Sequence, residues 1–265
     1  MPFARVNKID LYYEMHGYGD PVFLVPGLAS DAATWTTFVP EFSSDYRLII
    51  VENRGSGRSA KPAGEYSTAL MAEDAVALLE HLGIERAHVI GKSMGGMIAQ
   101  MIAARYPQKV RSLVLACTLM KHDAYGQELL DLGRILAQKA GLYETFRQAF
   151  LLSYSKEYCM THRSRLEEAK KFLTETASEE VLRGYAGQSH ACENHDSRIP
   201  AKQIKAPTLV LVGKDDIITG PEHSRELAAA IPRSSLVIMP RGGHGFWREF
   251  PDDVNPIVRE FLRQH

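Results

Sequence analysis

The stretch VIGKSMGGMIAQ, residues 89–100, passes from an apolar run to a helical one through a single serine, Ser93. Residues 91–95 fit the pattern G-x-S-x-G, which between a strand and a helix marks a nucleophile elbow. A side chain at the tip of so tight a turn forces strained backbone angles on the serine. The turn also brings strand and helix so close that Cβ atoms at Gly91 and Gly95 would clash. The pattern therefore predicts a nucleophilic hydroxyl at Ser93, and the simpler alternative is a Gly-Ser turn without chemistry.

The flanking sequence alternates β-rich and helical runs, which predicts an α/β fold with a mostly parallel, eight-stranded sheet flanked by helices. We expect strands at residues 5–9, 11–15, 22–25, 47–51, 88–91, 112–116, 208–212 and 235–239. We expect helices at residues 31–38, 68–82, 94–106, 127–140, 143–154, 162–176, 178–188, 221–230 and 252–263.

The alternation of strands and helices stops at about Lys121 and resumes at Pro207. No strand candidate occurs between these points, and the segment reads as several helices. We therefore expect an α/β core made of residues 1–120 and 205–265, interrupted by an all-helical insertion at 121–204.

Composition and charge exclude several classes of function. The chain has 31 Lys and Arg against 32 Asp and Glu, whereas binding nucleic acid requires clustered positive charge. No apolar run approaches the roughly 18 residues of a membrane span. The first residues lack the apolar segment of a signal peptide, and three widely spaced cysteines give no disulfide framework. We expect a cytoplasmic protein without nucleic-acid or membrane partners; its oligomeric state, a homodimer included, stays open.

A catalytic serine needs a base to take its proton and an acid to orient that base. In this fold class the chain order is serine, then Asp or Glu, then His. The stretch VLVGKDDIITG, residues 210–220, supplies Asp215 and Asp216 after a predicted strand, and of these we favour Asp216. The stretch VIMPRGGHGFW, residues 237–247, supplies His244 in a glycine-rich loop after the last predicted strand. The alternative for this histidine is an ordinary surface position.

Stabilising the oxyanion formed on attack needs two backbone N–H donors. One would come from Met94, directly after the nucleophile, where the helix N-terminus also favours negative charge. The other would come from the loop PGLAS, residues 26–30, in which Gly27 permits unusual backbone angles and Leu28 presents its N–H. An ordinary turn between strand and helix is the alternative for this loop.

Five stretches, in the expected order, resemble motifs of the α/β-hydrolase superfamily: LVPGLASDAATW, ENRGSGRS, GKSMGG, APTLVLVGKDD and GGHGFWREFP. The resemblance covers nearly the whole chain. It is strongest to cofactor-free hydrolases that include carboxylesterases, 3-oxoadipate enol-lactonases and meta-cleavage C–C bond hydrolases. It implies the α/β-hydrolase fold, no cofactor, and a helical cap at 121–204 that sets substrate choice. It also implies these roles: nucleophile Ser93, acid Asp216, base His244, and oxyanion amides Leu28 and Met94.

Two positions depart from the family pattern. Pro26 stands where the family usually has a histidine that buttresses the oxyanion loop, which bears on the geometry of that loop. Glu52 stands where the family usually has aspartate. We expect ENRGSGRS to be structural, with Arg54 tying loops together and taking no catalytic role.

The resemblance implies hydrolysis of a small-molecule carboxylic ester or lactone through an acyl-enzyme intermediate. The alternatives are a meta-cleavage C–C hydrolase, a cofactor-free haloperoxidase or perhydrolase, and a ligand-binding receptor on the same fold. Trp35 and Trp247 are candidates for the substrate pocket, with core packing as their alternative. We expect no metal, because one set of zinc-type ligands matches no standard finger spacing: Cys159, His162, His190, Cys192 and His195.

Overall fold

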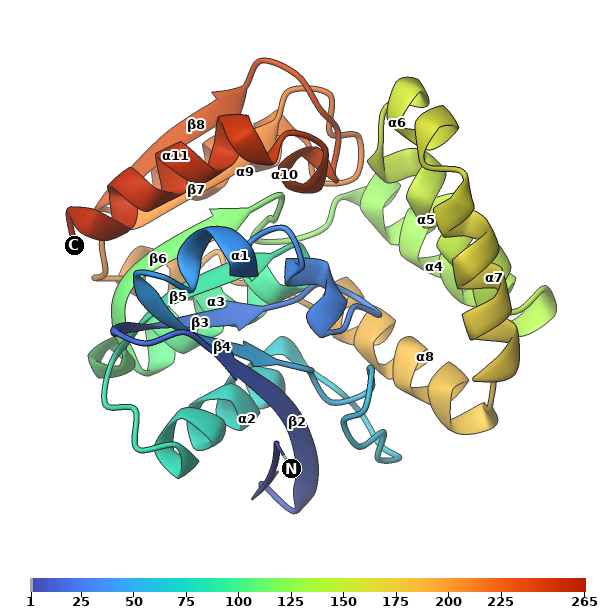
Figure 1. Cartoon of the computed structure of the whole chain (residues 1–265), viewed down its shortest axis with the longest axis horizontal. Helices are drawn as coiled ribbons and strands as arrows, with labels where there is room; N and C mark the ends of the chain where they lie inside the picture. Colours follow the sequence, from blue (N-terminus) through green and yellow to red (C-terminus); the bar gives the residue numbers. More distant parts are fainter. Residues whose placement is uncertain (1) are drawn as a thin grey trace.

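Eight strands form a single sheet at the centre of the computed structural model, which describes residues 2–265 (Figure 1). The strands are β1 (Phe3–Val6), β2 (Ile9–His16), β3 (Asp20–Val25), β4 (Tyr46–Val51), β5 (Ala87–Lys92), β6 (Val110–Ala116), β7 (Thr208–Gly213) and β8 (Ser234–Met239). Their order across the sheet is β1-β2-β4-β3-β5-β6-β7-β8. The β1–β2 and β2–β4 pairs are antiparallel and every other pair is parallel. The expected mostly parallel, eight-stranded sheet is confirmed.

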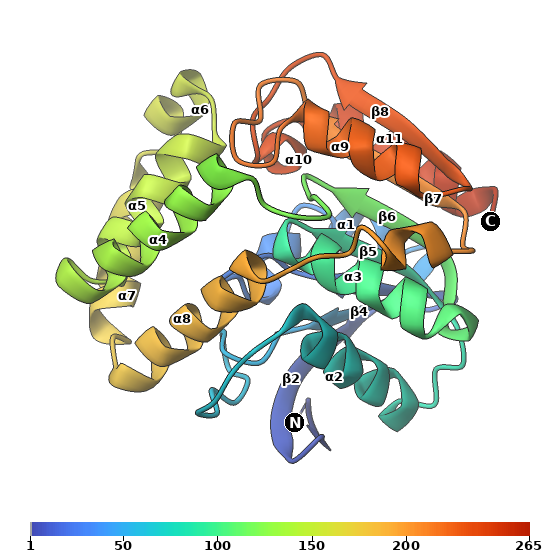
Figure 2. The same cartoon turned by 180° about the vertical axis from the view of Figure 1, so that it is seen from behind.

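Helices cover both faces of this sheet, as the views from opposite sides show (Figures 1 and 2). One face packs against α2 (Thr68–His81), α3 (Met94–Arg105) and α9 (Pro221–Ala230). The other face packs against α1 (Val39–Phe42) and α11 (Pro251–Arg263). Because both faces are covered, the central strands read as continuous apolar runs.

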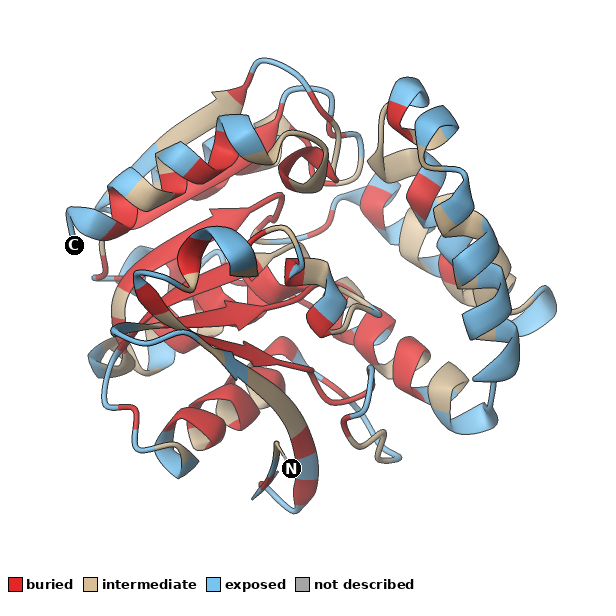
Figure 3. Ribbon diagram, in the orientation of Figure 1, coloured by how far each residue is buried: buried red, intermediate tan, exposed pale blue. Residues whose placement is uncertain are grey.

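Between β6 and β7 the chain forms a helical insertion of five helices: α4 (Ala124–Lys139), α5 (Leu142–Ser153), α6 (Lys156–Thr161), α7 (Ser164–Glu175) and α8 (Glu179–Glu193). A bridge between Lys121 and Asp196 joins the two ends of this insertion. In both views α4 to α7 stand away from the sheet, whereas α8 runs back toward it. Burial differs most between the last two helices, because α7 has no buried residue and α8 turns a buried face to the core (Figure 3).

Short elements complete the chain: the 3₁₀ helices η1 (Ala32–Trp35), η2 (Pro107–Lys109) and η3 (Pro200–Gln203), and helix α10 (Phe246–Glu249). Among residues 2–265, no helix has both the length and the apolar character that crossing a bilayer requires.

The structure corrects three expected elements. The strand expected at 5–9 is wrong, because Asn7 and Lys8 have φ of 46° and 66°, as a two-residue hairpin turn between β1 and β2 requires. The helix expected at 31–38 is instead η1 followed by α1. Helix α6 lies outside the expected helices, although its N-cap Ser155 is a recognisable start signal.

Candidate active site

Ser93 occupies the sharp turn between β5 and α3, with φ of 54° and ψ of −122°. An L-residue rarely adopts a positive φ, so the surrounding packing must hold the backbone in this form. A Cβ at Gly91 would overlap the carbonyl of Gly95, and a Cβ at Gly95 would overlap the carbonyls of Val25 and Pro26. Close approach of strand, helix and loop therefore requires both glycines of the G-x-S-x-G pattern.

His244 lies against Asp216 in a hydrogen-bonded network beyond the ends of β7 and β8. Nδ1 of His244 is 2.9 Å from Oδ2 of Asp216. Oδ1 of the same carboxylate accepts the backbone N–H groups of Ile218 and Thr219 at 2.8 and 2.9 Å. The hydroxyl of Thr219 donates to Oδ2 at 3.0 Å and lies 3.1 Å from the imidazole Nδ1. With its proton on Nδ1, the imidazole donates to the carboxylate and keeps Nε2 free to accept a proton.

The carboxylate of Asp216 is buried yet charged. Burial by itself raises its pKa, but the charge and hydrogen bond of His244 and the backbone donors outweigh that effect, so the pKa lies below its ordinary value. The neighbouring Asp215 has a different partner, because its Oδ2 accepts the N–H of Gly242 at 3.1 Å. Asp215 therefore shapes the histidine loop, and Asp216 faces the imidazole.

The three predicted triad residues lie at one edge of the sheet. Ser93 follows β5, Asp216 follows β7 and His244 follows β8, and the carboxyl ends of these parallel strands share that edge. Within residues 2–265, no hydrogen bond joins Ser93 to His244. A catalytic hydrogen bond is often long before substrate binds and shortens in the complex. The structure thus puts the predicted acid Asp216 and the predicted base His244 in contact, with the predicted nucleophile Ser93 at the same edge of the sheet.

The two amides predicted for the oxyanion hole have no internal partners. Within the described chain, neither the N–H of Leu28 nor that of Met94 donates a hydrogen bond, whereas the N–H of Ala29 does. A Cβ at Gly27 would lie 3.3 Å from the Cβ of Ser93, so the loop of Leu28 passes close to the serine. Unpaired N–H groups beside the attacking oxygen are what a developing oxyanion requires.

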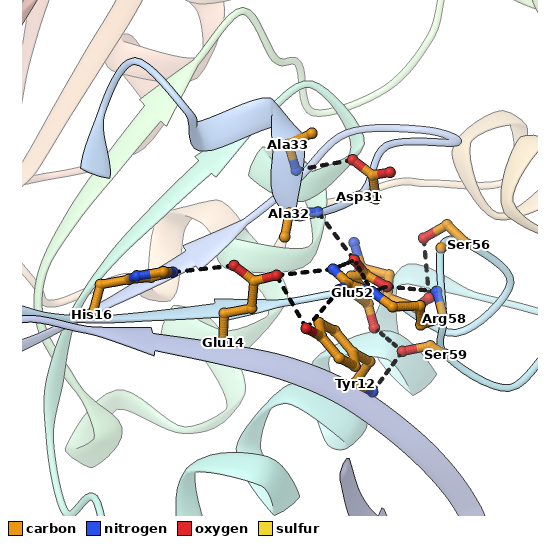
Figure 4. Close-up of polar contacts among 12 residues, drawn as sticks. Tyr12, Glu14, His16, Asp31, Ala32, Ala33, Glu52, Ser56, Arg58 and Ser59 are labelled. Atoms are coloured by element: carbon orange, nitrogen blue, oxygen red, sulfur yellow. Dashed lines mark hydrogen bonds and ion pairs between the residues drawn. The ribbon is translucent and has the colours of Figure 1, made fainter. Parts of the chain in front are cut away.

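Side chains that follow β4 hold the loop that follows β3. Nδ2 of Asn53 donates to the carbonyl of Pro26 at 3.1 Å. The buried carboxylate of Glu52 accepts the N–H of Ala32 at 3.3 Å and pairs with Arg58 at 2.5 Å (Figure 4). At the two positions that depart from the family pattern, the carbonyl of Pro26 is held by Asn53 and the carboxylate of Glu52 holds Ala32, so the loop is anchored without a histidine.

Arg54 ties the same segment to α2. Its Nε and Nη2 donate to the carboxylate of Asp74 at 2.5 and 2.8 Å, and the two side chains are 8% and 4% exposed. A two-pronged ion pair at this depth gives Arg54 a structural role, although it joins the loop to a helix and not, as expected, one loop to another.

The two tryptophans predicted for a substrate pocket lie in the core layer. Trp35 and Trp247 are 1% and 3% exposed, and their rings pack edge to face at 6.1 Å between centroids. The ammonium of Lys92 lies 5.6 and 5.8 Å from these two ring centroids. Burial lowers the pKa of Lys92 to about 8, with Cys117 opposing and Arg248 adding to the shift. The pocket role stays a prediction, and the observed contacts are those of core side chains around a cation.

The zinc-type residues of the helical insertion have other contacts. His162 stacks on Tyr158 with 3.9 Å between ring centroids, and Nδ1 of His195 lies 2.8 Å from the hydroxyl of Thr68. Within residues 2–265, no three His, Cys, Asp or Glu side chains are placed to hold a metal ion together.

Two residues near the site lie outside the sequence predictions. Thr219 contacts the predicted acid–base pair, and its place three residues after Asp216 in a turn is a local signal that could have indicated this contact. Gln188 reaches from α8 to the N–H of Ala29 at 2.8 Å, and no local pattern indicates such a contact.

Comparison with known proteins identifies the family. The model of the alpha/beta hydrolase fold matches residues 20–247. The protein "Putative carbamate hydrolase RutD" of Caulobacter sp. (strain K31) is 30% identical over 258 residues, which cover 95% of each chain. The "Putative non-heme bromoperoxidase BpoC" of Mycobacterium tuberculosis is 31% identical over 272 residues, covering 96% of this chain and 98% of its own. The crystal structure of the enol-lactonase from Burkholderia xenovorans LB400 superposes with a TM-score of 0.90 at 26% identity, covering 99% and 100% of the two chains. The chain belongs to the alpha/beta hydrolase fold family.

Proposed function

We propose that the protein is a serine hydrolase that cleaves a small carboxylic ester or lactone through an acyl-enzyme intermediate. The assignment as a hydrolase follows from the family. The finer assignment rests on one observation: the pair of buried Asp216 and half-buried His244 and two unpaired amides share the sheet edge of Ser93. The similarity to an enol-lactonase favours an ester or lactone carbonyl as the point of attack.

In the proposed mechanism, Ser93 attacks the carbonyl carbon while Nε2 of His244 takes the hydroxyl proton. The oxyanion is stabilised by the N–H groups of Leu28 and Met94. The leaving oxygen departs with the proton from His244, and the acyl group stays on the serine. Water, deprotonated by the same imidazole, then releases the acid. Asp216 keeps the imidazole in one tautomer and stabilises its cation.

A perhydrolase or haloperoxidase is the second candidate, because a relative named as a bromoperoxidase is 31% identical over almost the whole chain. In that chemistry hydrogen peroxide replaces water in the second step and a peracid leaves the serine. The same three side chains serve both reactions. Peroxide-dependent formation of peracid from acetate would distinguish the second activity from simple hydrolysis.

The direct test is hydrolysis of p-nitrophenyl acetate by wild type and by Ser93→Ala. We expect the substitution to lower turnover by roughly 10³-fold or more, because it removes the attacking atom. Circular dichroism and the melting temperature check that the variant remains folded. A fluorophosphonate probe should add mass to the peptide that carries Ser93.

Ester turnover that survives in Ser93→Ala would contradict the proposal. Tight binding of esters without turnover by the wild type would favour the receptor alternative. A panel of esters, lactones, carbamates and meta-cleavage diketones, compared by kcat/KM, would then rank the possible scissile bonds.

A further inference from the structure

The last helix of the insertion, α8, is built into the core. Gly184 lies against Gly55, where a Cβ would overlap the Gly55 carbonyl, and a Cβ at Gly187 would lie 2.8 Å from the ring of Tyr66. Helical residues three and four positions apart lie on one face, so Gly184, Gly187 and Gln188 point the same way. The two glycines let this buried face approach the core closely (Figure 3).

Gln188 is fully buried, and both the oxygen and the nitrogen of its side-chain amide form hydrogen bonds with core loops. Its Oε1 accepts the N–H of Ala29 at 2.8 Å, and its Nε2 donates to the carbonyl of Arg54 at 2.7 Å. Leaving a buried polar group unpaired costs about 1–3 kcal/mol, so the buried amide of Gln188 is held to both loops. One side chain of the insertion thus connects two loops of the core.

Ala29 lies in a strained turn. Its φ is 53°, and the N–H of Ser30 donates to the carbonyl of Gly27 at 3.3 Å. A β-turn with positive φ at its third residue, but not at its second, is of type II. Glycine normally occupies the third position, because an L-residue at that position costs about 1–2 kcal/mol. Flipping the peptide between Leu28 and Ala29 would relax the turn to type I and turn the Ala29 N–H away from Gln188. The bond to Gln188 therefore stabilises the strained form, together with the Ser30 hydroxyl, which donates to the carbonyl of the same peptide at 3.3 Å.

We propose that Gln188 is a positioning residue for the oxyanion hole: by fixing the peptide between Leu28 and Ala29, it restricts movement of the adjoining Gly27–Leu28 peptide, whose N–H faces the oxyanion on Ser93. The inference rests on the proposed function, since that amide has this role only if Ser93 is the nucleophile. It gives the helical insertion a part in setting the catalytic geometry.

The peptides on either side of the Leu28 amide are held from different parts of the fold. Asn53, in the core, holds the carbonyl of Pro26 at 3.1 Å, and Gln188, in the insertion, holds the N–H of Ala29. Loss of the core anchor would free one end of the loop and loss of Gln188 the other. The segment carries no histidine buttress, so its geometry depends on these contacts, on the Ser30 hydroxyl at the Leu28 carbonyl and on Glu52 at the Ala32 N–H.

The test measures Gln188→Leu in two backgrounds, the wild type and Ala29→Gly, with p-nitrophenyl acetate as substrate. In the wild-type background we expect kcat to fall about 10- to 100-fold with little change in KM, because the hole acts on the transition state. Glycine adopts positive φ without strain, so the turn then depends less on Gln188. In the Ala29→Gly background, Gln188→Leu should lower kcat by a factor at least roughly three times smaller than in the wild-type background.

Three further variants control for packing. Gln138→Leu makes the same change on the exposed side of α4 and should leave kcat unaltered. Gln188→Met is unbranched and of similar length, so it repeats the loss of polar atoms with a smaller steric change. Gln188→Glu keeps an acceptor for the Ala29 N–H and should retain more of the wild-type kcat than Gln188→Leu or Gln188→Met. Melting temperatures are recorded for all variants.

Wild-type kcat in a folded Gln188→Leu or Gln188→Met variant would overturn the inference. Equal losses in both backgrounds would assign Gln188 to helix packing alone and overturn it too. Ser93→Ala separates failure of the proposed function from failure of the positioning role. If this variant keeps turnover, the proposed function fails. If it loses turnover while the Gln188 variants do not, only the positioning role fails.

Discussion

The imidazole of His244 and the carboxylate of Asp216 meet at 2.9 Å, although 28 positions separate them in the chain. Their side chains are 14% and 0% exposed. The carboxylate accepts three further hydrogen bonds, from Ile218 and Thr219. Fixed donors of this kind replace water around a buried charge, so the aspartate stays ionised and can orient the imidazole.

Thr219→Val should weaken the acid–base pair without a change of shape. Valine matches threonine in size but removes the hydroxyl that donates to Asp216. Losing one hydrogen bond to a buried charge, worth ~1–2 kcal/mol, should lower kcat/KM roughly 5- to 30-fold. Thr219→Ser, which keeps the hydroxyl, is the control. Steady-state kinetics on an ester decide the matter, and equal kcat/KM in the valine and serine variants would contradict the expected role.

Gly95→Ala should disturb the elbow and the oxyanion loop together. The added Cβ would overlap the carbonyls of Val25 and Pro26, and backbone cannot move aside as a side chain can. We expect a loss of about 1–3 kcal/mol in the free energy of unfolding, with a lower kcat. Gly83→Ala is a comparison for backbone strain without overlap and should leave kcat unchanged, because its positive φ is strained but its Cβ would meet nothing within 4 Å. A Gly95→Ala variant with wild-type stability in urea denaturation would show that overlap at the elbow is unimportant.

Arg54→Leu should destabilise the fold, because it leaves the Asp74 carboxylate buried without its cation. Breaking one side of a buried pair costs about 3–5 kcal/mol, whereas replacing both partners by apolar residues is often nearly neutral. Arg54→Leu with Asp74→Leu should therefore be more stable than Arg54→Leu alone. Denaturant unfolding measures the difference, and a double variant less stable than the single one would refute this account.

Lys92→Met should stabilise the protein at neutral pH. Burial lowers the pKa of Lys92 to about 8, from a usual value of 10.5, so the folded state binds its proton more weakly than the unfolded state does. Stability linked to this group is present above pH 10.5 and is lost as the pH falls to 8. The methionine variant avoids that loss, so its gain in melting temperature should be full below pH 8 and shrink toward pH 10.5.

The matched control for this experiment is Lys139→Met on the exposed end of α4. Its melting temperature should show no comparable gain at neutral pH. A gain in Lys92→Met that did not vary between pH 7 and pH 10 would attribute the effect to packing against Trp35 and Trp247 and not to charge.

By itself, the sequence determined the features that local sterics and periodicity govern. Gly91 and Gly95 mark the elbow because a strand and a helix cannot approach so closely around Ser93 with Cβ atoms present. Continuous apolar runs indicated strands covered on both faces, and the sheet has that form. The hairpin at Asn7 and Lys8 escaped this pattern, because positive φ at two non-glycine residues leaves no trace in hydrophobic periodicity.

Only the tertiary structure decided which groups meet across long separations. Asp215 and Asp216 are neighbours in the sequence, but in the folded loops Asp215 accepts the N–H of Gly242 and Asp216 contacts His244. The bond from Gln188 to Ala29 spans 159 positions and exists because α8 packs against the core. Contacts of this kind depend on how separate elements pack together. The spacing of residues along one element does not indicate which other elements pack against it.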